Sequence, residues 1–204
     1  MEKFEVFDEN GKQKRVIETR ETVHARGLWH RTVHIWVYRG TEILLQRRAR
    51  TKDSHPGLWD VSAAGHIGVR EPPLKAAVRE TAEELGIEAE EKDLLHIGTR
   101  RCTLVSRQGR FIDREFTDIY LYCFEKSMKD LHPDPEEIEE LRFYEIDVLK
   151  NLLGTEETKK NFVPHERSYY MWVFDIVTDL ISLCETLRGG LPCGNPPGGN
   201  HPGV

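Results

Sequence analysis

Three glutamates in one short segment are the residues of this chain best suited to chemistry. Glu80, Glu83 and Glu84 lie in the stretch RETAEELGI at residues 79–87. On an α-helix with about 100° per residue, their carboxylates fall within an arc of roughly 100° and repel one another. Magnesium would relieve this repulsion, because it binds carboxylate oxygens and usually shares them with substrate phosphates. The pattern therefore indicates a hard-cation site or, as the plainer alternative, a solvated acidic face in which Arg79 pairs with Glu83.

A helix over residues 74–85 is predicted to present these glutamates. Pro72 and Pro73 suit its start, because proline is tolerated in the first turn, and Gly86 suits its C-terminal cap. The apolar residues of the segment recur with helical spacing, so they define the side that we expect to face the core. That side consists of Leu74, Val78, Thr81 and Leu85, with Ala77 and Ala82 at its edges.

The remaining segments alternate between strand and helix patterns. Runs rich in β-branched and aromatic residues predict strands, and longer amphipathic runs predict helices. Strands mixed with helices on this scale favour an α/β architecture, in which helices cover a sheet. We expect strands at 32–38 and 42–46, joined as a hairpin, then at 94–105, 116–124 and 141–146, a short strand within 59–65, and helices at 147–153 and 167–187.

The length and composition fit one globular domain. The 204 residues are 38% hydrophobic, which allows a core of ordinary size. The formal net charge of −6 makes the chain a poor candidate for binding nucleic-acid polymers or membranes without specificity. No apolar run is long enough to span a membrane, no signal peptide is recognisable, and the four cysteines form no CxxC pair. We therefore expect a cytoplasmic protein whose partner is a small molecule.

The last segment of the chain differs in composition from the rest. Residues 189–204 hold six of the sixteen glycines and four of the ten prolines. Such a segment cannot bury enough apolar surface to offset the entropy lost on ordering. We therefore predict a folded domain over residues 1–188 and a disordered tail over residues 189–204.

The glutamates also belong to a longer pattern that resembles the Nudix box, GX5EX7REUXEEXGU, in which U is aliphatic. Thr81 is the one departure, and its methyl group still suits the core. So many identities at fixed spacing are rare by chance, and the resemblance favours the cation site over the solvated face. The fixed positions that match are Gly65, Glu71, Arg79, Glu80, Glu83, Glu84 and Gly86.

The resemblance implies a Nudix hydrolase with an α/β/α sandwich and a mixed β-sheet. Such an enzyme would use Mg²⁺, or Mn²⁺ in its place, to cleave a diphosphate linkage, and Nudix proteins are often homodimers. Glu80 is the first choice for positioning the attacking water, and a glutamate outside the box is the alternative. Arg79 would orient Glu71. Gly65 would offer its backbone carbonyl and, because it has no side chain, would let another group approach closely. The implied metal ligands are Glu80, Glu83, Glu84 and Glu115, and the implied catalytic set is Glu71, Arg79, Glu80 and Glu83.

Residues beside the box resemble the Nudix branch around isopentenyl diphosphate isomerase. In the isomerase a cysteine precedes the glycine–histidine pair and transfers a proton, whereas this chain has Ala64 there. Because alanine cannot transfer a proton and the hydrolase box is complete, the chain is similar to the isomerase-like hydrolases. The likeness covers roughly residues 3–125, and its residues include 30–31, 44–48, Lys52, 56–60 and 64–66.

The same likeness suggests further site residues. Arg48 and Lys52 align with positions that hold the diphosphate, and ordinary surface charge is the alternative. The isomerase's own metal site has three histidines and two acids, and this chain has a similar set. The match is imperfect, because His24 and His30 are one residue closer together than in the isomerase. Hydrogen-bonded loop histidines are the alternative, whereas Trp36 and Trp59 are expected in the core. The candidate set is His24, His30, His66, Asp113 and Glu115.

Two other functions compete with hydrolysis. One is isomerisation of an allylic diphosphate, and the other is a non-catalytic module that senses a nucleotide. Loss of box glutamates would favour either, and none is lost. Nucleotide sugars, dinucleotides, oxidised nucleotides and prenyl or thiamine diphosphates all remain candidate substrates.

Overall fold

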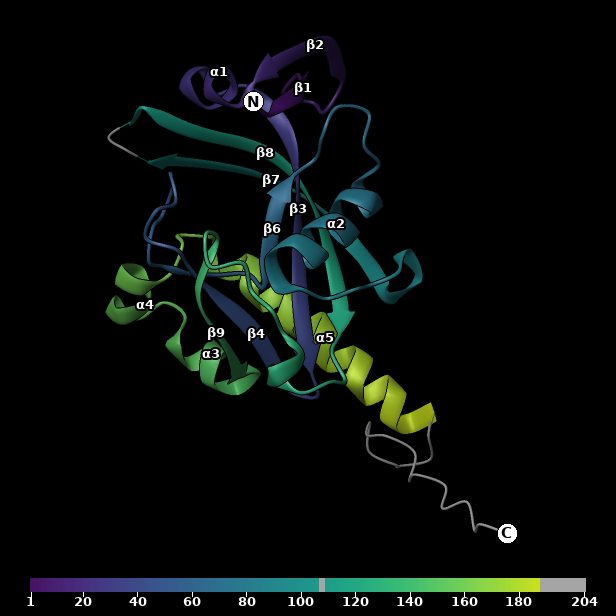
Figure 1. Ribbon diagram of the computed structural model, residues 1–204. Coiled ribbons are helices and arrows are strands. Elements are labelled where there is room, and N and C mark those ends of the chain that lie inside the picture. Colours follow the sequence, from purple (N-terminus) through teal and green to yellow (C-terminus); the bar gives the residue numbers. More distant parts are fainter. Residues whose placement is uncertain (107–108, 188–204) are drawn as a thin grey trace.

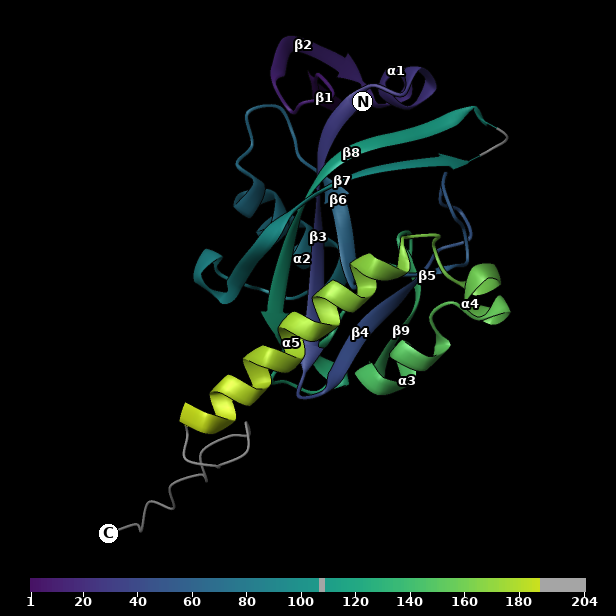
Figure 2. The same ribbon diagram turned by 180° about the vertical axis from the view of Figure 1, so that it is seen from behind.

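One mixed sheet with a long helix on each face organises the molecule (Figures 1 and 2). The computed structural model describes residues 1–106 and 109–187. The strands are β1 (Lys3–Phe7), β2 (Gln13–Thr19), β3 (Trp29–Arg39), β4 (Glu42–Arg48), β5 (Trp59–Asp60), β6 (Ala63–His66), β7 (Leu94–Ser106), β8 (Phe111–Cys123) and β9 (Ile138–Glu145). The helices are α1 (Arg20–Arg26), α2 (Pro73–Leu85), α3 (Ile146–Leu152), α4 (Glu156–Asn161) and α5 (Arg167–Leu187), with short 3-10 turns at Glu91–Asp93 and Met128–Asp130.

The predicted α/β architecture is confirmed, and so are both long helices and the expected strands, except that the one strand expected within 59–65 is two, β5 and β6, which pair with β4 and β3. The sequence patterns did not predict β1, β2 or α1, which form the end of the molecule at the top of Figure 1, nor the short helix α4. The segment 189–204, predicted to be a disordered tail, lies outside the described residues. None of the helices up to Leu187 is long and apolar enough to cross a membrane.

The central strand β3 separates from its hairpin partner β4 soon after the turn. It runs parallel to β8 from Trp29 to Tyr38 and antiparallel to β6 through four residue pairs. With β4, however, it pairs only at Tyr38–Ile43 and Arg39–Glu42, and β4 pairs instead with β5 and β9. The sheet therefore divides into two halves that diverge from the hairpin, and side chains of both halves line one cavity.

The α2 helix packs on one face of the sheet through a narrower apolar stripe than predicted. Ala76, Ala77 and Leu85 are fully buried, whereas Leu74 and Val78 are only partly buried. The predicted core side is confirmed at Leu74 and Val78, which pack against the core, whereas Ala82, expected at its edge, is exposed. The cavity beside the helix also buries Glu80 and Glu84. Thr81, the departure from the box, is fully buried. Its hydroxyl donates to the carbonyl of Ala77 at 2.7 Å, so the polar atom is satisfied inside the helix.

The α5 helix covers the opposite face, as Figure 2 shows. Its residues Tyr170, Val173 and Phe174 are buried against strand residues that include Trp36. Trp36 is fully buried and Trp59 packs at the edge of the same cluster, as expected for core residues. The cavity therefore lies beside the helix that carries the glutamates, and α5 covers the other face of the sheet.

Candidate active site

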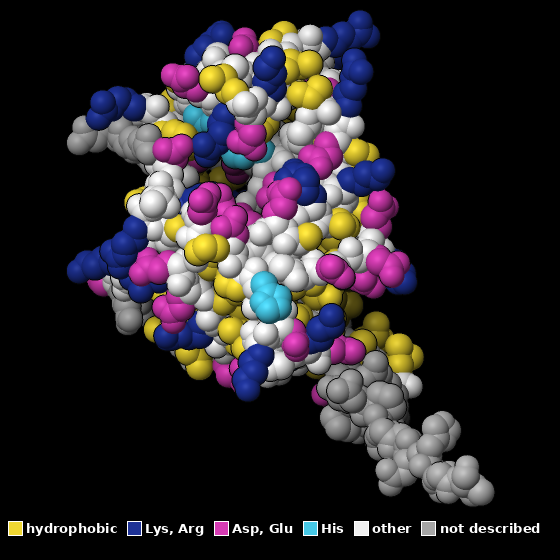
Figure 3. All heavy atoms as spheres, viewed as in Figure 1, with side chains coloured by type: hydrophobic (Ala, Val, Ile, Leu, Met, Phe, Trp, Pro, Cys, Tyr) yellow, Lys and Arg dark blue, Asp and Glu magenta, His cyan; other side chains and the backbone are white. Residues whose placement is uncertain are grey.

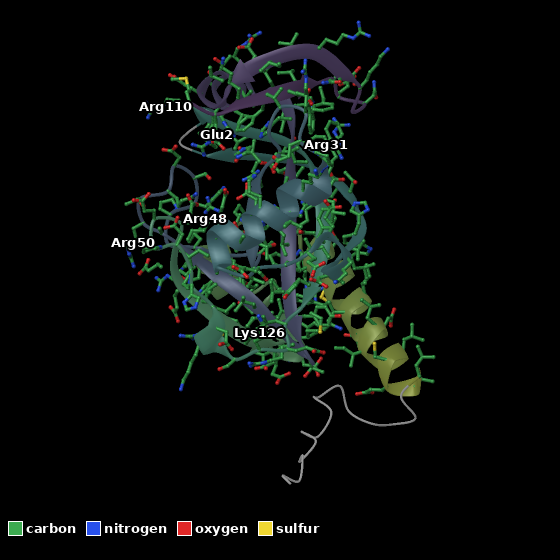
Figure 4. The ribbon with its side chains drawn as sticks, turned by 45° about the vertical axis from the view of Figure 1, so that its right-hand side comes forward. Glu2, Arg31, Arg48, Arg50, Arg110 and Lys126 are labelled. Atoms are coloured by element: carbon green, nitrogen blue, oxygen red, sulfur yellow. The ribbon has the colours of Figure 1, made fainter. Side chains whose placement is uncertain are left out.

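A cavity of about 420 Å³ lies between the two halves of the sheet. Figure 3 shows a hollow on this face with histidine and acidic side chains around it, and Figure 4 places Glu2 toward its β1 end and Arg48 toward its β4 end. Nine acidic side chains line it but only four basic ones, so the cavity carries excess negative charge. The acids are Glu2, Asp60, Glu80, Glu83, Glu84, Asp113, Glu115, Asp134 and Glu137, and the bases are Arg20, Arg48, Lys52 and Arg79.

The three box glutamates occupy unequal positions on α2. Glu80 and Glu84 are 8% and 6% exposed, whereas the side chain of Glu83 is 59% exposed. The carboxylate of Glu84 accepts hydrogen bonds from the Gln46 amide at 2.9 Å and from the Ala64 backbone N–H at 3.2 Å. Glu84 is therefore fixed against β4 and β6, while Glu83 stays at the mouth of the cavity.

Gly65 lies directly beneath Glu80. A Cβ atom added to Gly65 would lie 1.9 Å from the carboxyl carbon of Glu80, which no real contact allows. The sequence predicted that another group approaches Gly65 closely, and that group is the Glu80 side chain. Only glycine leaves that carboxylate where it is.

Arg79 links the loop after β6 to the glutamates of the helix. Its guanidinium donates to both oxygens of Glu71, at 2.9 and 3.0 Å, and to the carbonyl of His66 at 3.0 Å. It also donates to Glu80 at 2.7 Å and to Glu83 at 2.9 Å. The hydrogen bonds from Arg79 lower the pKa of Glu71. Arg79 thus holds Glu71, as the box predicts, and it also lies between the carboxylates of Glu80 and Glu83.

Burial changes the ionisation of the inner carboxylates. It raises the pKa of Glu84 to about 8 and that of Glu80 to about 7. Burial also raises the pKa of Glu115, on β8. Near neutral pH these groups hold protons unless a cation replaces them, and cation binding would release those protons.

A second group of metal-ligating side chains lies beside the box. The ligand atoms of His24, His30 and His66 all lie within 4.8 Å of one another, and those of His30, Asp113 and Glu115 do so as well. His24 and His30 use Nδ1 to reach the carbonyls of Arg20 and Leu28, at 2.7 and 3.0 Å. Carbonyls only accept, so Nδ1 of each ring carries a proton, and in the neutral ring the lone pair is on Nε2.

The free nitrogens of these histidines are arranged as in a cation site. Nε2 of His24, His30 and His66 is buried and makes no hydrogen bond to the described residues. That of His24 lies 3.1 Å from a carboxylate oxygen of Asp113, so two lone pairs face each other unless a cation or proton lies between them. Burial lowers the pKa of His30 to about 4 and keeps that of His66 well below its ordinary value. Neutral imidazoles next to carboxylates suit a divalent metal.

Comparison with known proteins places this geometry in a family. The model of the NUDIX domain matches residues 28–165. The chain belongs to the Nudix family. It is 34% identical over 187 residues to Nudix hydrolase 3 of Arabidopsis thaliana, covering 86% of this chain and 23% of that protein, so the chain spans about a quarter of that relative. An uncharacterised Nudix hydrolase of Clostridium acetobutylicum is 32% identical over 205 residues, covering 86% of this chain and 97% of that protein.

Other matches agree with the isomerase-like branch and with the fold. The isopentenyl-diphosphate Delta-isomerase of Streptomyces griseus is 33% identical over 141 residues, or 69% of each chain. A MutT protein of Methanosarcina mazei superposes with a TM-score of 0.53 at 17% identity, covering 72% of this chain and 93% of that one. A Nudix hydrolase of M. smegmatis gives 0.51 at 19% identity, covering 86% and 95%. The two structures show the Nudix fold, and the relatives identify a Nudix hydrolase, from a family that generally acts on diphosphate-linked nucleosides.

The two basic residues expected to hold substrate both line the cavity of this Nudix hydrolase, but acids already engage them. Arg48 lies 3.3 Å from Asp60 and donates to the carbonyl of Ser54 at 3.1 Å. Lys52 forms an ion pair with Glu137. Diphosphate binding by these two residues therefore stays a prediction, and both cations are paired with acids in this structure.

Several lining or supporting residues received no role from the sequence, Gln46, His34, Asp60 and His165 among them. Gln46 holds Glu84, and His34, Asp60 and His165 line the side of the cavity nearest α5. No spacing rule joins them, because they lie on β3, β4, β5 and the loop before α5. Only His34 had a signal in the sequence, as an isolated histidine within the strand-like run at 32–38.

Proposed function

We propose that this Nudix hydrolase cleaves a diphosphate linkage in a small organic diphosphate with Mg²⁺, which Mn²⁺ can replace. The observation that carries the proposal is the charge of the cavity, nine acidic side chains against four basic ones. A diphosphate is itself an anion and would be repelled there. Divalent cations on the glutamates reverse the sign of the field, and they polarise phosphoryl oxygens and stabilise developing charge when bound.

The position of each side chain indicates its role. Glu80 and Glu84 are the buried carboxylates that would hold the ion, with Glu115 from β8 as a further ligand and Glu83 at the mouth for a second ion or its water. Glu80 is also our choice to accept the proton of the attacking water. Water oxygen bonds to phosphorus, and the bridging oxygen departs with the electrons of its bond as part of a phosphate. Arg79 positions Glu71 and Glu80.

The histidine group would hold a further divalent ion. Its donors are three imidazole nitrogens with Asp113 and Glu115, a set that suits a transition metal such as Mn²⁺ better than Mg²⁺. Phe4 stacks on His66 with ring centroids 4.3 Å apart, and Phe111 stacks on His24 at 4.3 Å. These rings fix the imidazoles and limit the access of water.

A phosphate-release screen over organic diphosphates with Mg²⁺ tests the proposal. We expect turnover of at least one substrate, which chelation of the metal abolishes and Glu84→Gln lowers at least a hundredfold. Binding of a nucleotide without any cleavage would favour the sensing module. Equal turnover by the folded Glu84→Gln variant would refute the metal assignment.

Isomerisation remains the second candidate because curated isomerases are 33% identical to this chain. Ala64 argues against isomerisation, because a methyl group has no acidic proton to transfer.

A further inference from the structure

Three polar residues form the end of the cavity nearest α5, apart from the box and the histidine group. His34 lies on β3 and pairs in register with Ala64 on β6. Asp60 ends β5, and His165 lies two residues before α5. All three line the cavity and are nearly buried, with 6% and 5% of His34 and Asp60 exposed and 5% of the His165 side chain.

A buried hydrogen-bond chain fixes the proton of His34. The hydroxyl of Tyr169 lies 2.8 Å from Nε1 of Trp36 and 2.8 Å from Nδ1 of His34. An indole nitrogen and a guanidinium only donate, and both Trp36 and Arg100 form hydrogen bonds with this hydroxyl, so its two lone pairs are occupied and its own hydrogen points to His34. His34 must therefore carry its proton on Nε2. Burial keeps the pKa of His34 well below its ordinary value, so the ring is neutral and offers one N–H donor to the cavity.

The Asp60–His165 pair supplies the opposite kind of group. One oxygen of Asp60 accepts from Nε2 of His165 at 2.9 Å and from the Val61 N–H at 2.8 Å, and the other lies 3.3 Å from Arg48. Burial acts to raise the pKa of Asp60, but the contacts with His165 and Arg48 hold it well below its ordinary value, so Asp60 is a carboxylate. Nδ1 of His165 is buried without a hydrogen-bond partner among the described residues. A buried polar atom in a cavity wall needs a partner, and a polar group of a bound substrate can supply it.

The mixture of donor and acceptors selects one ligand chemistry. A phosphate group offers only acceptors, and the carboxylate of Asp60 repels its charge. A hydrocarbon chain would leave the N–H of His34 and the nitrogen of His165 unpaired in a buried place. A hydroxyl group both donates and accepts, so it satisfies both sides at once.

We propose that His34, Asp60 and His165 form a subsite for a hydroxylated group of the substrate, such as the sugar ring joined to the diphosphate. The proposal deepens the proposed function and rests on it. His34 is paired with Ala64, whose N–H binds Glu84. The subsite is therefore next to the metal-binding carboxylates, where the first ring beyond the diphosphate would lie. Prenyl diphosphates, which carry no hydroxyl there, are excluded as preferred substrates.

Kinetics with two probes tests this selectivity. With Mg²⁺, we expect kcat/KM of the wild type to be at least a hundredfold higher for ADP-ribose than for geranyl diphosphate. His34→Phe and His165→Phe should each lower that preference at least tenfold. Glu84→Gln should slow the hydrolysis of ADP-ribose without creating activity on geranyl diphosphate. The matched control is His132→Gln, an exposed histidine outside the cavity, which should behave as wild type.

Histidine ¹⁵N NMR of the wild-type protein tests the subsite without turnover or refolding of a variant. We expect His34 in the Nε2–H form, and a mixture of both forms in Tyr169→Phe. Ribose 5-phosphate with Mg²⁺ should shift the His34 Nε2 resonance, whereas inorganic pyrophosphate with Mg²⁺ should leave it in place.

The outcomes separate the two proposals. Equal shifts with pyrophosphate, an Nδ1–H form of His34, or efficient hydrolysis of geranyl diphosphate would each overturn the hydroxyl subsite. Failure to hydrolyse any diphosphate would overturn the proposed function alone, because the NMR titration still decides what His34 binds.

Discussion

At the scale of single residues, Glu83 and Glu84 differ in burial although both belong to the box. We predict that Glu83→Gln and Glu84→Gln each lower turnover at least a hundredfold in a folded protein, because each removes a charge that holds cations. Only Glu84→Gln should raise the metal-free melting temperature, since Glu84 is buried and Glu83 is 59% exposed. Activity assays and thermal melts check this pair, and near-full activity in both variants would contradict the metal site.

The raised pKa values of the buried glutamates predict how stability depends on pH. Glu80, at about 7, and Glu84, at about 8, keep protons in the folded state that the unfolded chain has released above its pKa near 4.5. The folded state therefore binds more protons, and its stability falls as pH rises toward 8. Histidines whose pKa is lowered in the folded state make stability rise with pH, but only below about pH 6.5.

Thermal melts in a chelator between pH 6.5 and 8.5 measure this effect. We expect the melting temperature of the wild type to fall across that range, and to fall less steeply in Glu84→Gln. Saturating Mg²⁺ should offset the fall. A wild-type slope that Glu84→Gln leaves unchanged would show that this carboxyl does not titrate there.

At the scale of elements, the close contact of β6 with α2 decides where Glu80 lies. Gly65→Ala would put a methyl 1.9 Å from the Glu80 carboxyl carbon. We predict a loss of at least a hundredfold in turnover with a small change in melting temperature, because the end of a flexible side chain can move aside. Gly68→Ala is the matched control, since its Cβ would lie 3.1 Å from an oxygen of Glu71 and should cost less activity. Wild-type turnover in Gly65→Ala would show that Glu80 needs no fixed place.

The sequence predicts the elements better than it predicts which of their faces are buried. The α2 helix and the strands around it follow from spacing within single segments, and these predictions are confirmed. The predicted core side of α2 is confirmed at Leu74 and Val78 but was wrong at its edge, where Ala82 is exposed. A cavity beside the helix buries Glu80 and Glu84 as well, and no local pattern reveals a cavity.

Contacts between distant segments limit prediction of the site in the same way. The resemblance to the Nudix box identified the glutamates, Arg79 and Gly65. His34 and Tyr169, however, are 135 residues apart and meet only because α5 packs across β3. The strand β1 was also missed, although its Phe4 closes the histidine group. Its few residues carry too little periodic signal, and tertiary packing decides their structure.

At the scale of the whole molecule, the divided sheet gathers more acid than base into one cavity. We predict that Mg²⁺ or Mn²⁺ raises the melting temperature in a concentration-dependent way, because ions that bind only the folded state stabilise it. Glu84→Gln should weaken the response to Mg²⁺, whereas His24→Asn should weaken mainly the response to Mn²⁺. Thermal melts over a metal titration check this, and an equal response in all three proteins would argue against two separate ion sites.

The same fold is similar both to hydrolases and to isomerases, and Ala64 distinguishes the two reactions. We predict that the wild-type protein does not convert isopentenyl to dimethylallyl diphosphate. Ala64→Cys alone should not do so either. A thiol there would face His34 in register, and isomerisation also needs an opposing acid within about 3 Å of the reacting carbon.

Proton NMR in deuterated water with Mg²⁺ follows the vinyl and methyl signals of isopentenyl diphosphate during incubation with either protein. An active isomerase preparation is the positive control. Deuterium incorporation at a turnover rate by the wild-type protein would overturn the hydrolase assignment, because only a working proton-transfer site exchanges those positions. Exchange by Ala64→Cys alone would instead show that the rest of the isomerase machinery is still in place, and that the cysteine is the one part that the hydrolase lacks.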